Sequence, residues 1–239
     1  MNKNDKLISV VGVIILILAS IGIYTWNTEE TSKHISSIDD FYTVSSSLTN
    51  LPDAVAVSDS DPFYALIATP LAVNYNADGQ QEIIPMYVQN FTDTSRAISR
   101  AEDQIGISTN EFIDCTKSAK EWSIYIAKQY FVESDAALII ENNEAGYNLG
   151  VMATPIASYL SIPIIVTANI DNNITELFNG LGLKKTIICG DNIEGYGEVL
   201  RFSTVEDIIN NTTKLLINKF GKFDYITITN PIDAWPQEI

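Results

Sequence analysis

Apolar residues lie along this chain in one long run and in many short ones. The long run, residues 7–26, contains no charged side chain. After residue 50, short apolar or β-branched runs alternate with longer segments in which apolar residues recur every three or four positions. The short runs predict buried strands, and the periodic segments predict amphipathic helices. Their alternation is typical of an α/β fold, in which helices cover both faces of a parallel sheet through right-handed crossovers.

The run at residues 7–26 is long enough to cross a bilayer as a helix, because about 20 apolar residues span the hydrocarbon core. Two lysines precede the run and two glutamates follow it. Because basic flanks stay on the cytoplasmic side, we expect residues 1–6 to be a cytoplasmic tail and the rest of the chain to be extracellular. A signal peptide cleaved near Ser20-Ile21-Gly22 is the open alternative, and it also exports the chain. The polar tails on both sides disfavour a buried core helix.

Residues 27–50 are rich in Ser, Thr, Asp and Glu, which predicts a polar stalk with one weak helix around Ile38–Tyr42. After the stalk we expect two copies of a strand–helix repeat, at residues 51–134 and 135–223. Residues 224–239 then begin a third copy, which we expect to be truncated.

The repeat is visible in three segments that begin alike, with an acidic residue followed by an apolar run, at Asp53, Asp135 and Asp224. Further matches follow in the same order in the first two copies. They are ATPLA at 68–72 and ATPIA at 153–157, then IPMYV at 84–88 and IPIIV at 162–166. Two such matches after similar strands indicate an internal duplication.

Each copy is expected to run strand, helix, strand, helix. The proline of the second strand stands at its start, where no ladder donor is lost. Amphipathic helices are predicted at 95–105 and 174–181, and Gly180 or Gly182 is expected to cap the latter. Residues 184–190 predict a further strand that the first copy lacks.

A long helix ends each copy, at residues 117–131 and 205–220. Short polar side chains that accept hydrogen bonds from the first turn are typical helix caps. The expected caps are Asp114 or Thr116 for the first helix, and Ser203 or Thr204 for the second.

The net charge of −16 disfavours binding to nucleic acid or to anionic lipid, because like charges repel, and it favours solubility. Cys115 and Cys189 form no C-x-x-C pair, so they are either joined in a disulfide or two buried free thiols. The only histidine is His34, in the expected stalk. We therefore expect no Ser-His-Asp triad, no His-ligated metal and no cofactor in the folded part.

Three segments of the second copy match a known pattern, as does the run Arg201-Phe202-Ser203. The segments are ATPIA at 153–157, IPIIVT at 162–167 and LGLKKTIICG at 181–190. Through them, roughly residues 52–233 resemble the cell-wall-binding repeat 2 family of bacterial and archaeal surface proteins. The resemblance implies Rossmann-like units, helices on both faces of a parallel sheet, and a role in holding surface proteins to anionic wall polymers. The D-R-Y/F-x-T-A pattern of that family is missing after Ser203.

Several polar and aromatic residues are expected at the carboxyl edge of the sheet, where open α/β folds bind ligands. They are Tyr147, Asn148, Asp191, Asn192 and Tyr196. Aromatic rings beside amides suit a sugar. The glycines at 146–150 do not have the G-x-G-x-x-G spacing and lie among acidic residues, which disfavours a dinucleotide.

Two further groups of residues carry weaker hypotheses. Four carboxylates follow equivalent strands: Asp59, Asp61, Glu141 and Glu144. A pair of them could serve as the acid and base of a glycoside hydrolase, but only if the two carboxylates lie at a defined separation. Sequons begin at Asn90, Asn173, Asn210 and Asn211, which are glycosylation candidates if the chain is exported.

Together these features predict a membrane-anchored, extracellular and non-enzymatic module of the cell envelope. Its expected roles are wall or surface-layer attachment, adhesion or scaffolding. The expected partners are an envelope polymer or surface-layer component, the membrane, and other repeat modules through self-association. The alternative is an extracytoplasmic α/β domain that binds a sugar or another small molecule, as part of a sensor or transporter. Such a receptor should have a deep pocket between two lobes, whereas a wall module should have a shallow shared surface.

Overall fold

The computed structural model describes residues 33–76, 78–93 and 95–222. The predicted tail at 1–6, the predicted membrane segment at 7–26 and the predicted third copy at 224–239 lie outside these residues. Within the described ranges, no helix is both long and apolar enough to cross a membrane.

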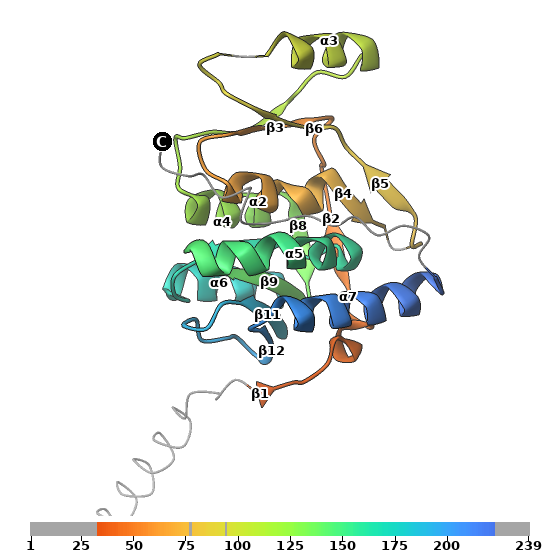
Figure 1. Cartoon of the computed structure of the whole chain (residues 1–239), viewed down its shortest axis with the longest axis vertical. Coiled ribbons are helices and arrows are strands. Elements are labelled where there is room, and N and C mark those ends of the chain that lie inside the picture. The colour runs from red at the N-terminus through yellow and green to blue at the C-terminus, as the bar shows by residue number, and fades with distance from the viewer. Residues whose placement is uncertain (1–32, 77, 94, 223–239) are drawn as a thin grey trace, which may run out of the picture. The chain divides into compact units, whose positions relative to one another are not determined.

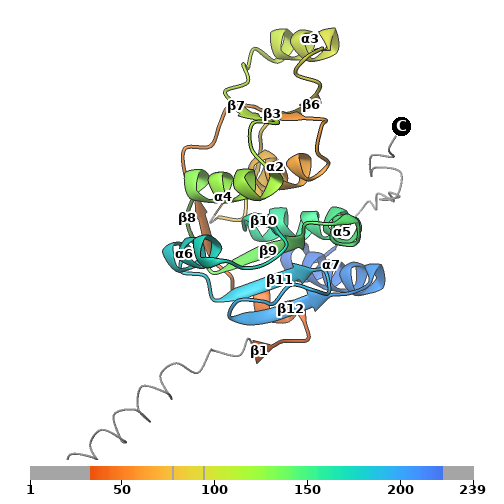
Figure 2. The ribbon, with the colours of Figure 1, turned by 90° about the vertical axis from the view of Figure 1, so that its left-hand side faces the viewer.

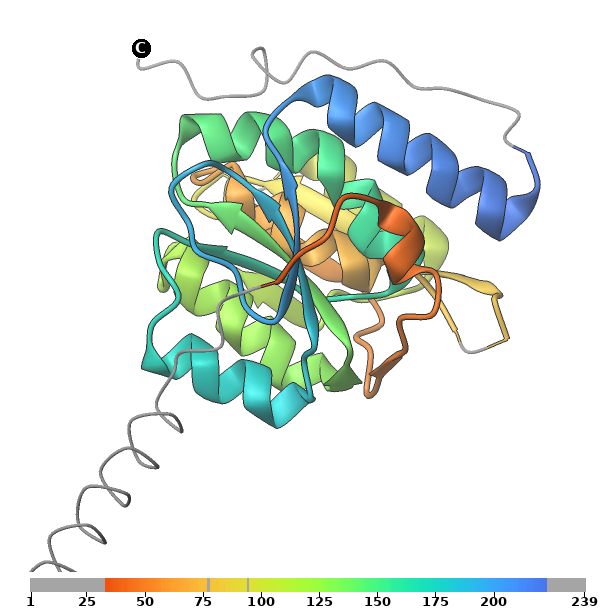
Figure 3. The same ribbon diagram turned by 90° about the horizontal axis from the view of Figure 1, so that it is seen from below.

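The larger of two parallel sheets has five strands. In spatial order they are β1 (Lys33–His34), β12 (Glu198–Phe202), β11 (Lys185–Cys189), β9 (Ala136–Glu141) and β10 (Ile164–Thr167). Helices α5 (Glu144–Leu160) and α7 (Val205–Phe220) cover one face, and α6 (Asn172–Leu181) lies on the other with α4 (Ala119–Tyr130) (Figure 3). Every residue of β9 is buried as a result, which explains its uninterrupted apolar sequence.

The smaller parallel sheet has three strands, β6 (Met86–Gln89), β3 (Val55–Ser58) and β7 (Glu111–Ile113), in that order. Helices α2 (Phe63–Ala72) and α4 lie on one side of it, and α3 (Arg96–Ile105) lies on the other (Figures 1 and 2). The described residues therefore form two parallel sheets, one built mainly from each repeat copy, rather than the single sheet expected.

The two sheets repeat one another in strand order and hydrogen bonding. The order β6-β3-β7 corresponds to β10-β9-β11. The N–H of Val55 donates to Pro85 O at 2.9 Å, and the N–H of Leu138 donates to Pro163 O at 3.0 Å. This register matches Asp53 with Ala136, one residue away from the expected match with Asp135.

The duplicated ATP segments also have matching structures. In α2 and α5 the proline lies inside the helix. The preceding threonine, Thr69 or Thr154, donates its hydroxyl proton to the carbonyl oxygen four residues earlier, at 2.7 Å in both cases. The two helices pack against each other and so join the copies.

The first copy was predicted to lack the strand found at 184–190, and this prediction was wrong. Strand β7 pairs with β3 as β11 pairs with β9. It is only three residues long and begins with Glu111, so its sequence is a weak strand signal. The hairpin of β4 (Val73–Tyr75) and β5 (Gln81–Ile83), found in the first copy, and strand β12 in the second were not predicted.

The described part of the expected stalk belongs to the fold. Strand β1 joins the large sheet, and β2 (Ser46–Leu48) pairs with β8 (Phe131–Ser134). Between them, Ile38 and Phe41 of the 3-10 helix η1 (Ile38–Phe41) are fully buried. Asn211 of α7 accepts a hydrogen bond from the Ile38 N–H at 3.0 Å. A stalk over residues 33–50 is therefore wrong, although the weak helix was correctly placed.

Two of the three predicted helix caps are confirmed. Thr204 caps α7 by accepting from the Asp207 N–H at 3.1 Å, and Gly182, with φ +75°, ends α6. Helix α4 differs, because Ser118 and Glu121 form a capping box at its start. The expected cap Asp114 instead binds Thr116 in the preceding turn, with its carboxylate accepting from the Thr116 N–H at 3.0 Å.

Candidate functional site

Strands β9 and β11 are parallel, so their carboxyl ends meet at one edge of the large sheet. The loop after β11 carries three of the predicted ligand residues, Asp191, Asn192 and Tyr196, and α5 begins at this same edge. The structure therefore brings this loop and the first turns of α5 together.

Glu141, the last residue of β9, occupies the centre of this edge. Its carboxylate accepts hydrogen bonds from the N–H of Asp191 at 3.1 Å, the N–H of Asn192 at 3.3 Å and the Asn192 side-chain amide at 3.0 Å. Burial acts to raise the pKa of Glu141, but the hydrogen bonds hold the pKa below its ordinary value. The donors that would suit an external anion are thus used by a carboxylate of the chain itself.

Gly190 allows this close approach. Its φ is +135°, and a Cβ atom at this position would lie 2.4 Å from Glu141 Oε2. Any other residue would push the loop away from β9.

Arg201 holds the rest of the loop in place. Its guanidinium group donates to the carbonyl oxygens of Gly190 and Ile193. Ser203 donates to Asp191 at 3.1 Å, and the hydroxyl of Tyr196 donates to Asn179 at 2.6 Å. The polar groups of the loop therefore bond mainly to the strands and the helix around it.

The two predicted residues on α5 lie differently. Tyr147 is buried and packs edge to face against Phe63 of α2, with ring centroids 5.4 Å apart, so it joins the two copies. Desolvation raises the pKa of its hydroxyl. Asn148 is partly buried, and its Oδ1 atom has no hydrogen-bond partner among the described residues. Tyr196 lies near the amino end of β11, where its N–H donates to the Thr186 hydroxyl at 3.2 Å and its ring packs on Phe178. The prediction that the two tyrosines stand at the carboxyl edge for stacking on a sugar was therefore wrong.

The remaining carboxylates do not gather into a metal site. Asp61 accepts from the N–H of Phe63 at 2.9 Å at the start of α2, and desolvation raises its pKa. In the part of the chain that the structure covers, no three Asp, Glu, His or Cys side chains are arranged to hold a metal ion.

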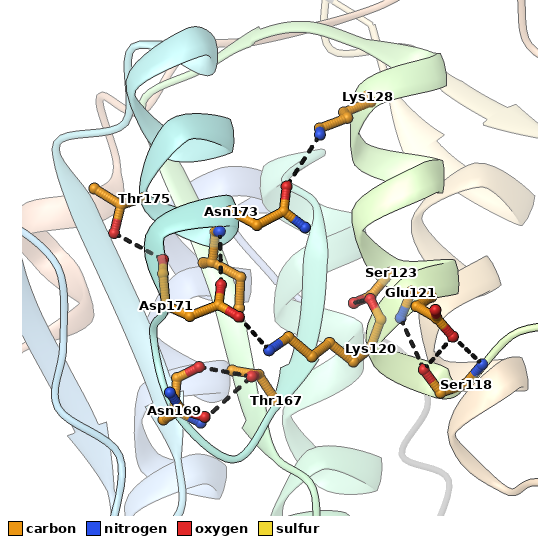
Figure 4. A network of polar contacts seen from close by, with 11 residues as sticks. Ser118, Lys120, Glu121, Ser123, Lys128, Thr167, Asn169, Asp171, Asn173 and Thr175 are labelled. Carbon is orange, nitrogen blue, oxygen red and sulfur yellow. Dashed lines mark hydrogen bonds and ion pairs between the residues drawn. The ribbon is translucent and has the colours of Figure 1, made fainter.

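A second polar network joins the two copies, and it was not among the predicted sites (Figure 4). Lys120 of α4 forms an ion pair with Asp171 at 2.7 Å, and Asp171 also caps α6 by accepting from the Ile174 N–H at 3.0 Å. Lys128 donates to Asn173 at 3.4 Å. The capping pattern of Asp171 is recognisable in sequence, but its partner on a distant helix is not.

A groove of about 250 Å³ lies beside this network. Its lining comes from the end of α4, from β8 and from α6: Lys128, Phe131, Val132, Glu176, Leu177, Gly180 and Leu181. The groove is mostly apolar, with one positive and one negative side chain.

The four sequons differ in accessibility. Asn90 is exposed in a turn where its Oδ1 accepts from the Thr92 N–H at 2.9 Å and hydroxyl at 2.6 Å. Asn173 binds Lys128, and Asn211 binds Ile38 and Asp207. Asn210 is exposed on α7.

Neither cysteine is in a disulfide. Cys189 is buried in β11, and desolvation raises the pKa of its thiol. Cys115 is exposed after β7. Both thiols are therefore free, but only Cys189 is buried as expected.

No protein-family model and no curated protein matches this chain. Among solved structures, it is similar to Cwp8 from Clostridium difficile, with 14% sequence identity and a TM-score of 0.41. The match covers 93% of this chain and 40% of that chain, so this chain spans less than half the length of Cwp8.

Proposed function

We propose that this chain is a non-enzymatic module of the cell envelope, anchored to the membrane by residues 7–26 and attached to a wall or surface-layer component. The observation that carries the proposal is the position of Glu141. Its carboxylate accepts the hydrogen bonds of the backbone N–H groups at the carboxyl edge of the large sheet.

Open parallel α/β sheets usually bind phosphates and cofactors at this edge, through backbone N–H groups and helix N-termini. Here an incoming anion would have to displace a buried carboxylate and meet its negative charge. This arrangement favours a structural role for the edge over a nucleotide-dependent reaction.

The groove beside α4 and α6 bears on the alternative of a soluble-ligand receptor. Small-molecule sites usually enclose about 300–1,000 Å³, with several polar groups that converge on the ligand. The groove at the junction of the copies holds about 250 Å³ and presents mainly apolar side chains. It therefore supports attachment through an extended surface better than capture of a small molecule.

The charge of the chain predicts how attachment should respond to salt. A net charge of −16 repels an anionic wall polymer, and added ions screen this repulsion. We expect binding to envelopes to increase with NaCl, and further with Mg²⁺, which can bridge carboxylates on both partners. A basic wall-binding protein would show the opposite dependence.

The proposal is tested in the source cells and with purified envelopes. Protease added to intact cells should degrade the chain. The purified full-length chain, kept in mild detergent, should sediment with envelope fragments to a greater extent at higher salt. A chain that is protected from protease until the cells are lysed, and that stays in the supernatant at every salt concentration, would overturn the proposal.

A further inference from the structure

One contact between the two copies covers a sheet edge. Strand β10 is the last strand of the large sheet, and α4 of the first copy lies against it. Ser123 of α4 accepts a hydrogen bond from the N–H of Val166 at 3.1 Å, and both residues are fully buried. An uncovered edge strand leaves backbone N–H groups unpaired, and this contact gives the Val166 N–H a partner at the edge of the large sheet.

The first copy has the counterpart of that edge, but nothing described covers it. Strand β6 corresponds to β10, and Val88 stands three residues after Pro85 as Val166 stands three residues after Pro163. Val88 is 53% exposed. Its N–H has no hydrogen-bond partner within the described ranges, whereas that of Val166 is bonded to Ser123.

The second copy has the counterpart of the covering helix. Helices α4 and α7 start with matching caps, Ser118 with Glu121 and Thr204 with Asp207. The match pairs Ser123 with Ile209, which is 50% exposed. It also pairs the buried Ala119 with Val205, which is 41% exposed.

Val205 and Ile209 continue into a stripe on α7 at helical spacing, with Thr213 and Leu216 partly buried beside them. We call these four residues the α7 face. In α4 the position that corresponds to Ile209, Ser123, is covered by β10, so Ile209 occupies the same place without its partner.

We propose that the α7 face of one chain docks on the β6 edge of a second copy of this chain. The contact repeats between chains what α4 and β10 do within one chain. Ile209 takes the place of Ser123 and Val205 that of Ala119, and together they cover Val88. Because the two surfaces are different, each docked pair leaves one of each free, and further copies can add.

The experiment uses the full-length chain in detergent, with mass measured by light scattering and sedimentation over a range of concentrations. Two variants remove one surface each, Ile209→Lys and Val88→Lys. Val132→Lys is the matched control, because Val132 is an exposed valine on β8, away from both surfaces. Far-ultraviolet circular dichroism confirms that each variant is folded.

The chain should self-associate, and each of the two variants should weaken this at least tenfold, while Val132→Lys leaves it unchanged. An equimolar mixture of the two variants should form pairs, because each still has the surface that the other lacks. A chain that stays monomeric overturns the proposal. So does self-association that survives both substitutions, as it would if the predicted membrane helix were the contact, or a mixture that forms no pairs.

Discussion

A methyl group on Gly146 would lie 2.1 Å from the backbone carbonyl oxygen of Glu141. The first turn of α5 therefore presses directly on the end of β9, and no side chain fits between them. Gly150, one turn later, also packs closely, since a Cβ atom there would lie 2.8 Å from the Cδ1 atom of Ile140. This approach places α5 and the carboxylate of Glu141 together at the carboxyl edge.

Gly146→Ala should destabilise the fold by about 3 kcal/mol or more, because either α5 or β9 must move. Gly180→Ala is the matched control, since a Cβ atom there meets nothing within 4 Å and alanine is the better helix former. It should stabilise the fold by about 0.5–1 kcal/mol. Urea unfolding followed by circular dichroism measures both, and equal effects would show that α5 does not contact β9 this closely.

Ser123→Ala should cost about 1–3 kcal/mol, because it leaves the buried N–H of Val166 without an acceptor. Ser99→Ala, on the exposed side of α3, should change the free energy of unfolding by less than about 0.5 kcal/mol. Hydrogen exchange adds a local measurement, since the Val166 amide should exchange faster in Ser123→Ala. An unchanged exchange rate would contradict the contact.

Glu141→Gln should lower stability at neutral pH by about 1–3 kcal/mol, because an amide group replaces an acceptor that faces three N–H donors. The pKa of Glu141 is lowered in the folded chain. Its contribution is therefore complete above the unfolded value of about 4.3 and is lost as pH falls through the lower folded pKa.

The wild-type chain should accordingly lose stability more steeply than Glu141→Gln below about pH 4, and the two curves should run parallel above about pH 6. Thermal unfolding from pH 3 to pH 7 measures this difference. Parallel curves over the whole range would mean that Glu141 is not held as a buried carboxylate.

Cys115 should react with a thiol reagent in the native chain, whereas Cys189 should react only after unfolding. Cys115 is exposed, while burial and a raised pKa keep Cys189 from forming the reactive thiolate. Labelling with iodoacetamide before and after denaturation, followed by mass spectrometry, should show one and then two labelled sites. A pair of cysteines that stays unlabelled until reduction would reveal a disulfide instead.

The buried strands and main helices were predictable because their signals are local. The apolar run at Ala136–Glu141 and the periodic segment at Val205–Phe220 each carry enough of a pattern to identify the element. The matching ATP and IP segments indicated the duplication for the same reason. Strand β7 was missed because three residues that begin with Glu111 give no pattern of this kind.

The sequence by itself determined which segments become strands and helices, that two stretches resemble each other, and which residues follow the strands. Only the tertiary structure decided that residues 33–50 pack into the fold. It also decided that Glu141 accepts hydrogen bonds from the N–H groups of Asp191 and Asn192, and that Tyr147 packs inward against Phe63. The reason is physical. Secondary structure follows from the spacing of neighbouring residues, whereas each of these outcomes depends on contacts between residues that are tens of positions apart and meet only when the sheets and helices are assembled.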